Sequence, residues 1–141
     1  MESKTIIQAI RDYFLPCELL KDGKINVDFL GDKPEYSIDP LPADPLIKKY
    51  VDGGSVRQYQ FVFTSKEYFD GDARTGIENS GFCQNLADWI EANNKKGVIP
   101  NLKGKLTSLY IEIMTSGYLF DMDPEYGRYQ IQCRLIYEQE A

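Results

Sequence analysis

The chain has 141 residues, a length typical of one domain with a single hydrophobic core. Its net charge of −6, from 22 acidic and 16 basic residues, disfavours a general grip on nucleic acid through phosphate neutralisation. Histidine, the usual general base and metal ligand, is absent, which weighs against the common kinds of hydrolase. The three cysteines are far apart without CxxC spacing, so we expect them to be reduced and mostly buried. We expect neither a signal peptide nor a membrane span, because charged residues interrupt every apolar run.

The first 40 residues predict a helix followed by two short strands. Apolar residues from Ile6 to Phe14 recur at three- and four-residue spacing, with Ser3 as the expected N-cap and Pro16 as the limit of the helix. Residues Ile25 to Phe29 and Glu35 to Asp39 alternate as strands. The turn residues between these strands predict a hairpin.

Three prolines between residues 39 and 45 predict a rigid, extended connection, because proline removes a backbone donor and fixes φ. Residues Ile47 to Val51 are compatible with either a turn of helix or an edge strand. Gly53 and Gly54 lack the GK[ST] ending of a phosphate loop, so we expect a hinge or bulge there. The long strand Ser55 to Ser65 follows.

The second half of the chain predicts a loop, a helix and two or three strands. The Gly- and Asp-rich residues 70–81 favour a loop that runs into a helix cap. Trp89 lies on the apolar face of the following helix and is expected to contact the sheet, and Gly97 and Pro100 end that helix. Leu106 to Thr115 forms the next strand, residues 118–120 lead to a turn over 121–127, and Arg128 to Tyr137 completes the chain.

The strongest pattern is strict alternation in two segments, RQYQFVF from Arg57 to Phe63 and RYQIQCRLIY from Arg128 to Tyr137. Alternation with period two indicates strands of a half-buried antiparallel sheet. We therefore expect an α+β fold in one domain over residues 1–141. Its mostly antiparallel sheet would have about five strands, with two helices packed on one face.

The polar side of these two strands is the candidate functional surface, and its expected members are Arg57, Gln58, Gln60, Arg128, Gln130, Gln132 and Arg134. One interpretation is a sheet face open to water. The other is a face that meets another subunit or lines a channel, because glutamines bond without the desolvation cost of buried charge. Aromatic residues at strand ends would suit such an interface, namely Tyr68, Phe69, Tyr118 and Tyr126.

No catalytic, cofactor or metal site is expected. The cysteines have no histidine partner for activation. The pairs Asp70–Asp72 and Asp121–Asp123 offer oxygens but do not continue into the spacing of a calcium loop, so we interpret them as solvated turn residues.

Three stretches of the chain resemble a family of small phage proteins. They are the run from Lys24 to Phe63, KINVDFLGDKPEYSIDPLPADPLIKKYVDGGSVRQYQFVF, the helix start from Asn79 to Glu91, and the ending GYLFD…RYQIQCRLIYEQ. Together with the N-terminal helix they are similar to minor capsid or tail-terminator proteins of long-tailed phages, prophages of Gram-positive bacteria and phage-tail-like bacteriocins. Residues 70–76 and 94–105 carry no fixed pattern of this family.

The resemblance implies a structural subunit that forms a ring, usually a hexamer, on the head-proximal end of the tail tube. The protein would be made in the bacterial host cytoplasm and incorporated into the virion. There it would stop tube polymerisation by occupying a surface, without enzymatic activity, cofactor or membrane. Its partners would be the tail tube protein and a head-completion or neck protein, and DNA would only pass through the lumen.

In such a ring, the edge of the Ser55 to Ser65 strand with its polar face would form one contact, and the loop Tyr68 to Gly76 would reach the tube or a neighbour. A neck adaptor or stopper of the same particle is an alternative role. A small enzyme or ligand-binding domain is a further alternative, disfavoured by the absence of histidine, of a Gly-rich phosphate loop and of metal spacing.

Overall fold

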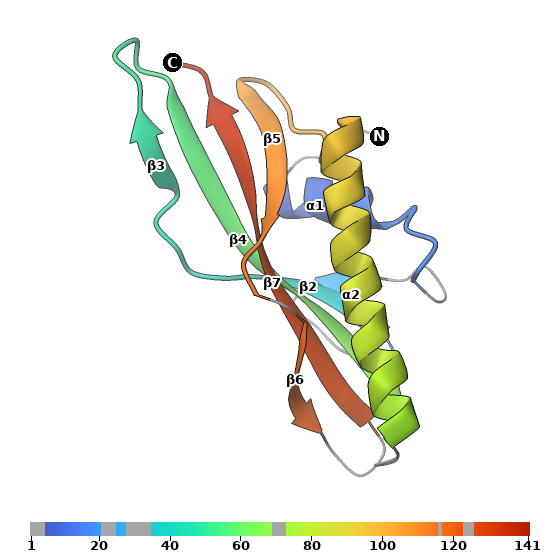
Figure 1. Ribbon diagram of the computed structural model, residues 1–141. Helices are drawn as coiled ribbons and strands as arrows, with labels where there is room; N and C mark the ends of the chain where they lie inside the picture. The colour runs from blue at the N-terminus through green and yellow to red at the C-terminus, as the bar shows by residue number, and fades with distance from the viewer. Residues whose placement is uncertain (1–4, 21–24, 28–34, 69–72, 116, 123–125) are drawn as a thin grey trace.

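The computed structural model describes residues 5–20, 25–27, 35–68, 73–115, 117–122 and 126–141. It has an α+β fold with two helices and a mostly antiparallel sheet, as the sequence predicts (Figure 1). The elements in chain order are α1 (Ile6–Phe14), β1 (Ile25–Val27), β2 (Glu35–Pro40), β3 (Leu46–Lys49), β4 (Ser55–Tyr68), α2 (Ala73–Lys96), β5 (Leu106–Ile113), β6 (Tyr118–Met122) and β7 (Tyr126–Gln139).

Strands β4 and β7 form the central antiparallel pair of the sheet. Each has 14 residues, and the pairing runs without a break from Ser55 opposite Gln139 to Tyr68 opposite Tyr126. These strands contain the two segments with strict alternation, so the prediction that they belong to one antiparallel sheet is confirmed. The unbroken register also means that alternation along the sequence directly assigns each side chain to a face.

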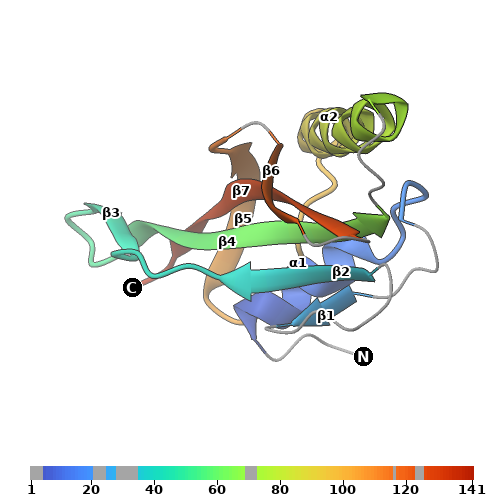
Figure 2. The same ribbon diagram turned by 90° about the horizontal axis from the view of Figure 1, so that it is seen from below.

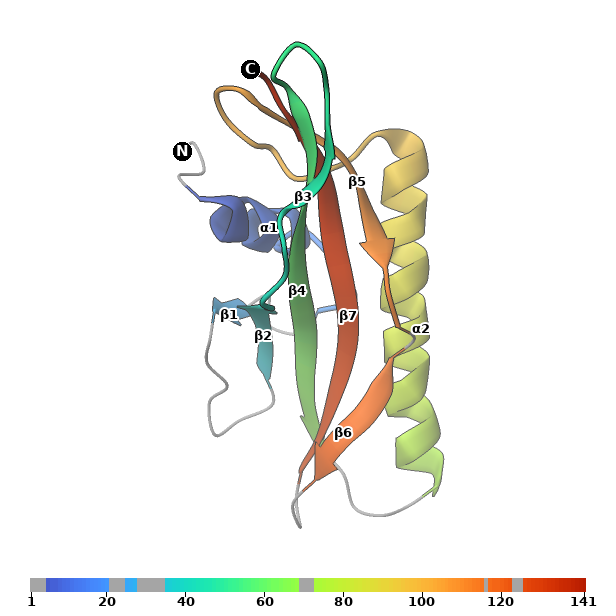
Figure 3. The ribbon, with the colours of Figure 1, turned by 90° about the vertical axis from the view of Figure 1, so that its left-hand side faces the viewer.

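Two strands flank each side of this pair. Strands β2 and β3 pair with successive parts of β4, whereas β5 and β6 pair with successive parts of β7 (Figure 3). With β1 outside β2, the sheet has seven strands, where about five were predicted. Of residues 47–51, which the sequence leaves open between helix and strand, residues 47–49 belong to the edge strand β3.

Both helices pack on the same face of the sheet, as predicted. In Figures 1 and 2 they lie on the side of the sheet away from β3. The ring of Phe14 on α1 has its centroid 5.1 Å from that of Phe63 on β4 and 5.8 Å from that of Trp89 on α2. Trp89 also lies 5.1 Å from Tyr13, so its aromatic neighbours are on α1, and it packs against the hydrophobic core that includes residues of the sheet. One hydrophobic cluster thus joins both helices to the sheet.

Two local predictions for the helices are wrong. The N-cap of α1 is Thr5, whose hydroxyl accepts a hydrogen bond from Gln8 N at 3.2 Å, whereas the expected cap Ser3 lies outside the described residues. Helix α2 begins at Ala73, inside the predicted loop 70–81. Gly76 and Gly81 are weak helix formers, but extending an existing helix needs no new nucleus, so the helix continues through both glycines. Gly97, with φ of 75°, ends α2 as expected.

The predicted hairpin of the two short strands is also wrong, because β1 pairs with β2 in parallel. Arg11 of α1 donates from Nε to the carbonyl oxygen of Ile25 at 2.8 Å. The placement of β1 therefore depends on its packing against α1, which turn residues between the strands do not encode.

Burial of titratable groups predicts a loss of stability at alkaline pH. Burial raises the pKa of Tyr13 from 10.0 to about 12 and that of the Cys133 thiol from 9.0 to about 12. Both groups stay protonated in the folded chain where the unfolded chain releases protons. Through these two groups, the free energy of unfolding should fall as the pH rises from about 9 to 12. Well below pH 9 both groups are protonated in the folded and the unfolded chain, so they contribute no pH dependence there.

Urea unfolding at a series of pH values measures this loss. Replacing Cys133 with alanine removes the thiol's proton, so the decline between about pH 9 and 12 should become shallower. An unchanged slope in this variant would contradict the raised pKa of the Cys133 thiol.

All three cysteines are free and buried, as expected. No helix in the described part of the chain has the length and apolar composition of a membrane span.

Candidate assembly surface

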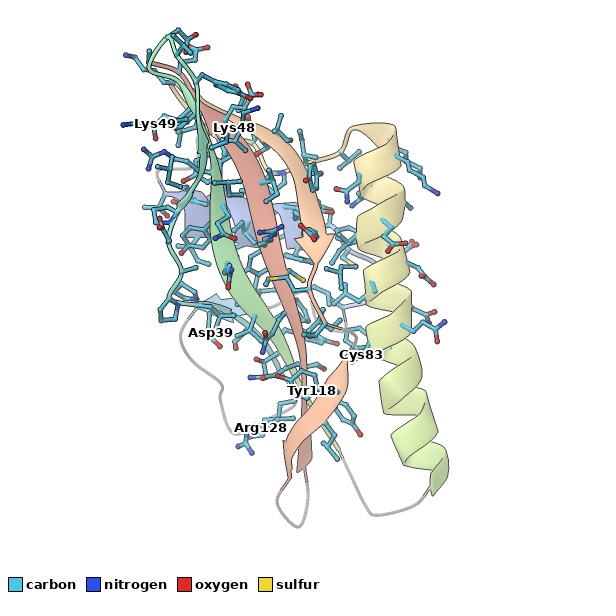
Figure 4. The ribbon with its side chains drawn as sticks, turned by 60° about the vertical axis from the view of Figure 1, so that its left-hand side comes forward. Asp39, Lys48, Lys49, Cys83, Tyr118 and Arg128 are labelled. Carbon is cyan, nitrogen blue, oxygen red and sulfur yellow. The ribbon has the colours of Figure 1, made fainter. Side chains whose placement is uncertain are left out.

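The candidate surface is the face of β4 and β7 that is turned away from both helices. Because the register is unbroken, even-numbered residues of both strands share this face, and Tyr59, Phe61 and Phe63 lie on the helix-covered face. We call this surface the polar face, and it comprises Gln58, Gln60, Gln130, Gln132 and Arg134 together with their partners Glu112 and Tyr118. In Figure 4 it is turned towards the viewer, with Tyr118 labelled near its lower end.

Arg57 does not belong to the polar face, and its predicted membership is wrong. It is directly opposite Tyr137 in the register, and both residues are odd-numbered. Burial raises the pKa of Tyr137, and the positive charge of Arg57 lowers it in part. Arg57 Nε instead donates to Ser55 Oγ at 3.0 Å. Its side chain therefore lies near the end of the helix-covered face.

The upper part of the polar face is a hydrogen-bonded network around Arg134. Its Nε and Nη2 atoms both lie 2.7 Å from Glu112 Oε2 on β5, and its Nη1 atom donates to Gln58 Oε1 at 2.9 Å. Gln58 Oε1 also accepts from Gln60 Nε2 at 3.1 Å, and Gln58 Nε2 donates to the carbonyl oxygen of Asp44 at 2.8 Å. The arginine charge is thereby balanced by Glu112 within the chain.

The lower part of the polar face is a second network around the hydroxyl of Tyr118 on β6. Gln132 Nε2 donates to this hydroxyl at 3.2 Å, and the hydroxyl donates to Gln130 Oε1 at 2.9 Å. The two hydrogen bonds point the same way, from Gln132 through the hydroxyl to Gln130. This is possible because a hydroxyl can accept one hydrogen bond and donate another. Tyr118, which was considered as an exposed contact residue, is therefore part of the polar face itself.

The burial of this surface differs from that of a sheet face fully open to water. The glutamines and Arg134 are half-buried, and Val62, Thr64 and Ile136 on the same face are buried. Amide side chains that already have hydrogen-bond partners are less costly to cover than isolated charges. The geometry is therefore suited to burial against another protein surface.

Two substitutions test the direction of the Tyr118 network. Gln132→Glu removes the donor to the Tyr118 hydroxyl, so we expect a loss of about 1–3 kcal/mol in the free energy of unfolding, because a partly buried group loses its partner. Gln130→Glu keeps an acceptor for the same hydroxyl and should cost clearly less. Urea unfolding of the two variants at neutral pH measures the difference. Equal losses would contradict the assigned direction.

Three of the remaining predicted contact residues lie at the far end of the central pair. Arg128 is half-buried on β7, opposite Lys66, and Figure 4 shows it near the lower end of the sheet. Tyr68 and Tyr126 are the paired end residues of β4 and β7. The side chains of Tyr68 and Tyr126, all of Phe69 and the loop 69–72 lie outside what the structure describes.

The sequence interpretation missed Asn94, which closes the outer edge of β5. Its Nδ2 atom donates to the carbonyl oxygen of Ile111 at 2.8 Å, and its Oδ1 atom accepts from Ile111 N at 3.1 Å. The amide of Asn94 thereby replaces a neighbouring strand at this position. The sequence does contain a signal for this role. Asn94 follows Leu86 and Ile90 at four-residue spacing, so it is a polar residue on the apolar side of the helix that faces the sheet.

The described residues offer no group of three histidine, cysteine, aspartate or glutamate side chains that could hold a metal ion. Asp70, Asp72 and Asp123, and the side chain of Asp121, lie outside the described part of the chain. Burial raises the pKa of the Cys17 and Cys133 thiols, which disfavours the reactive thiolate. No protein-family model matches this chain, and no curated protein sequence matches it either.

Proposed function

We propose that this chain is a structural subunit of a phage tail or phage-tail-like particle. In this role it forms a ring, usually a hexamer, that occupies the head-proximal end of the tail tube. The ring stops the addition of further tube subunits and offers its other side to the head-joining proteins. The mechanism is the occupation of a surface and needs no acid, base or nucleophile.

The observation that carries the proposal is the composition of the polar face. Its centre consists of neutral amides and Arg134, whose charge is balanced by Glu112, and all of them are held by hydrogen bonds within the chain. Lys66 and Arg128 lie on the same side of the strands, at one end of this surface. A prearranged surface of this kind loses little side-chain entropy and little charge solvation when a partner covers it. The resemblance of three long stretches to tail-terminator proteins agrees with such a contact.

The acidic composition supports the same role. A net charge of −6 disfavours retention of DNA, which has to pass through the lumen of a terminator ring. The absence of histidine from the whole chain agrees with a protein whose task is contact rather than chemistry. The protein would then be part of the virion.

Deletion of the gene from the phage or prophage that encodes this chain tests the proposal. The expected result is tubes of scattered, often excessive length in electron micrographs, because polymerisation has lost its stop. Tails of normal length attached to leaking heads would instead assign the chain to a stopper in the neck. Tails and heads without any defect would overturn both roles.

Complementation of the deletion tests the polar face itself. Gln130→Glu adds a charge to the polar face while it keeps the hydrogen bond from Tyr118, and it should fail to restore uniform tail length because covering a carboxylate without a cationic partner opposite it is costly. Gln84→Glu makes the same change on the exposed side of α2 and serves as the matched control. Equal restoration by both variants would contradict the use of the polar face.

A further inference from the structure

The exposed large apolar side chains of the described residues gather in two places. Nine such side chains are at least 38% exposed, and seven of them belong to two groups. The first group, which we call the β3 patch, consists of Leu46, Ile47, Tyr50 and Val51. The second group, which we call the β5–β6 patch, consists of Leu109, Tyr110 and Met114, on β5 and directly after it. Concentrated apolar exposure of this kind marks a surface that contacts another protein.

The two patches lie on opposite sides of the sheet's central pair. Strand β3 pairs with β4, whereas β5 pairs with β7, and Figure 1 shows β3 and β5 to either side of the central strands. Two different patches on opposite sides of one subunit permit a head-to-tail contact, in which the β3 patch of one copy meets the β5–β6 patch of the next.

The charges beside the two patches are complementary. Lys48 and Lys49 are exposed on β3, and Figure 4 shows both near the upper end of the molecule. Glu112 is the only charged residue of β5, and its side chain is 43% exposed. Arg134 contacts Glu112 through Oε2, and Oε1 has no hydrogen bond to the residues that the structure describes. A lysine of a second copy can therefore bind this oxygen.

The backbone of both edges disfavours a continuous sheet between copies. Strand β3 has only four residues, a register shift between Leu46 and Lys48, and two lysines, all of which are features that protect edge strands. On β5 the amide of Asn94 occupies the outward N–H and C=O of Ile111. A contact at these edges therefore depends on side-chain packing.

We propose that the partner of the β3 patch is the β5–β6 patch of a second copy of this chain. Repetition of this one heterologous contact builds a closed ring if the rotation between copies closes, and an open filament if it does not. The inference deepens the proposed ring and rests on it, because it names the two surfaces through which the subunits associate.

Three variants of the purified chain test this pairing. The first combines Ile47→Ser with Val51→Ser in the β3 patch, and the second combines Tyr110→Ser with Met114→Ser in the β5–β6 patch. Val98→Ser changes an exposed apolar residue outside both patches and is the matched control. Urea unfolding of each variant checks that the fold is retained, and light scattering after size-exclusion chromatography measures the mass.

The expected result is a multimer for the unchanged chain and for Val98→Ser, and a monomer for each patch variant alone. A one-to-one mixture of the two patch variants should give a dimer, because each variant supplies the intact surface that the other lacks. An unchanged chain that is monomeric at every concentration, a patch variant that still forms the multimer, or a mixture that stays monomeric would overturn the pairing. The mass measurements use the purified chain without a tail tube. A failure of the pairing is therefore distinguishable from a failure of the proposed function, which the tail-length experiment tests.

Discussion

Replacing Phe14 with alanine is expected to lower the free energy of unfolding by about 3–5 kcal/mol. Phe14 is fully buried, and its ring contacts Phe61 and Phe63 of β4 and Trp89 of α2. Its side chain therefore connects both helices to the central pair of the sheet. Alanine leaves a cavity where these elements meet, and the surrounding elements can only partly collapse into it.

Urea unfolding at pH 7 measures this loss, with Phe82→Ala as the graded control. Phe82 is half-buried, and its ring contact is with Tyr36 at 5.7 Å between centroids. Its truncation removes less contact area and should cost clearly less than that of Phe14. Similar losses in the two variants would show that Phe14 is not the central contact of the core.

Replacing Gly117 with alanine should destabilise the fold by about 1–3 kcal/mol or more, because the added methyl group has no space. Gly117 immediately precedes β6, where the chain passes close to α2. A Cβ atom built there would overlap Cβ of Cys83 and lie 2.8 Å from its Sγ atom. Figure 4 shows Cys83 on the side of α2 that is turned towards the sheet. Either α2 or the start of β6 must shift to accept the methyl group.

Gly81→Ala is the matched control, since a Cβ atom at Gly81 meets nothing within 4 Å. Gly81 lies within α2, where alanine is favoured over glycine by about 1 kcal/mol, so this variant should be neutral or more stable. Adding Cys83→Gly to Gly117→Ala removes the overlapping atoms and should restore part of the lost stability. Thermal or urea unfolding gives all three values, and equal effects of the two alanine substitutions would contradict the close approach at Gly117.

Alternation and helical periodicity are local properties, and they determined which side chains of each main element face the core. The odd-numbered residues from Tyr59 to Phe63 and from Tyr129 to Tyr137 lie on the helix-covered face because successive strand side chains point to opposite sides. The same rule places Arg57 on the helix-covered face. The sequence therefore contains the correct face of Arg57, although the prediction put it on the polar face. The fold class and the polar face of glutamines were therefore predictable from the sequence.

Only the tertiary structure decided how distant segments meet. The pairing of Arg134 with Glu112, the hydrogen bonds of Tyr118 to two glutamines and the amide of Asn94 on Ile111 all join residues at least 12 positions apart. The parallel placement of β1 and the addition of β3 and β6 to the sheet likewise depend on neighbours remote in the chain. Sequence patterns encode the direction of a side chain, whereas its partner is chosen by packing. For that reason the polar residues were visible in the sequence, but their networks and the two apolar patches were not.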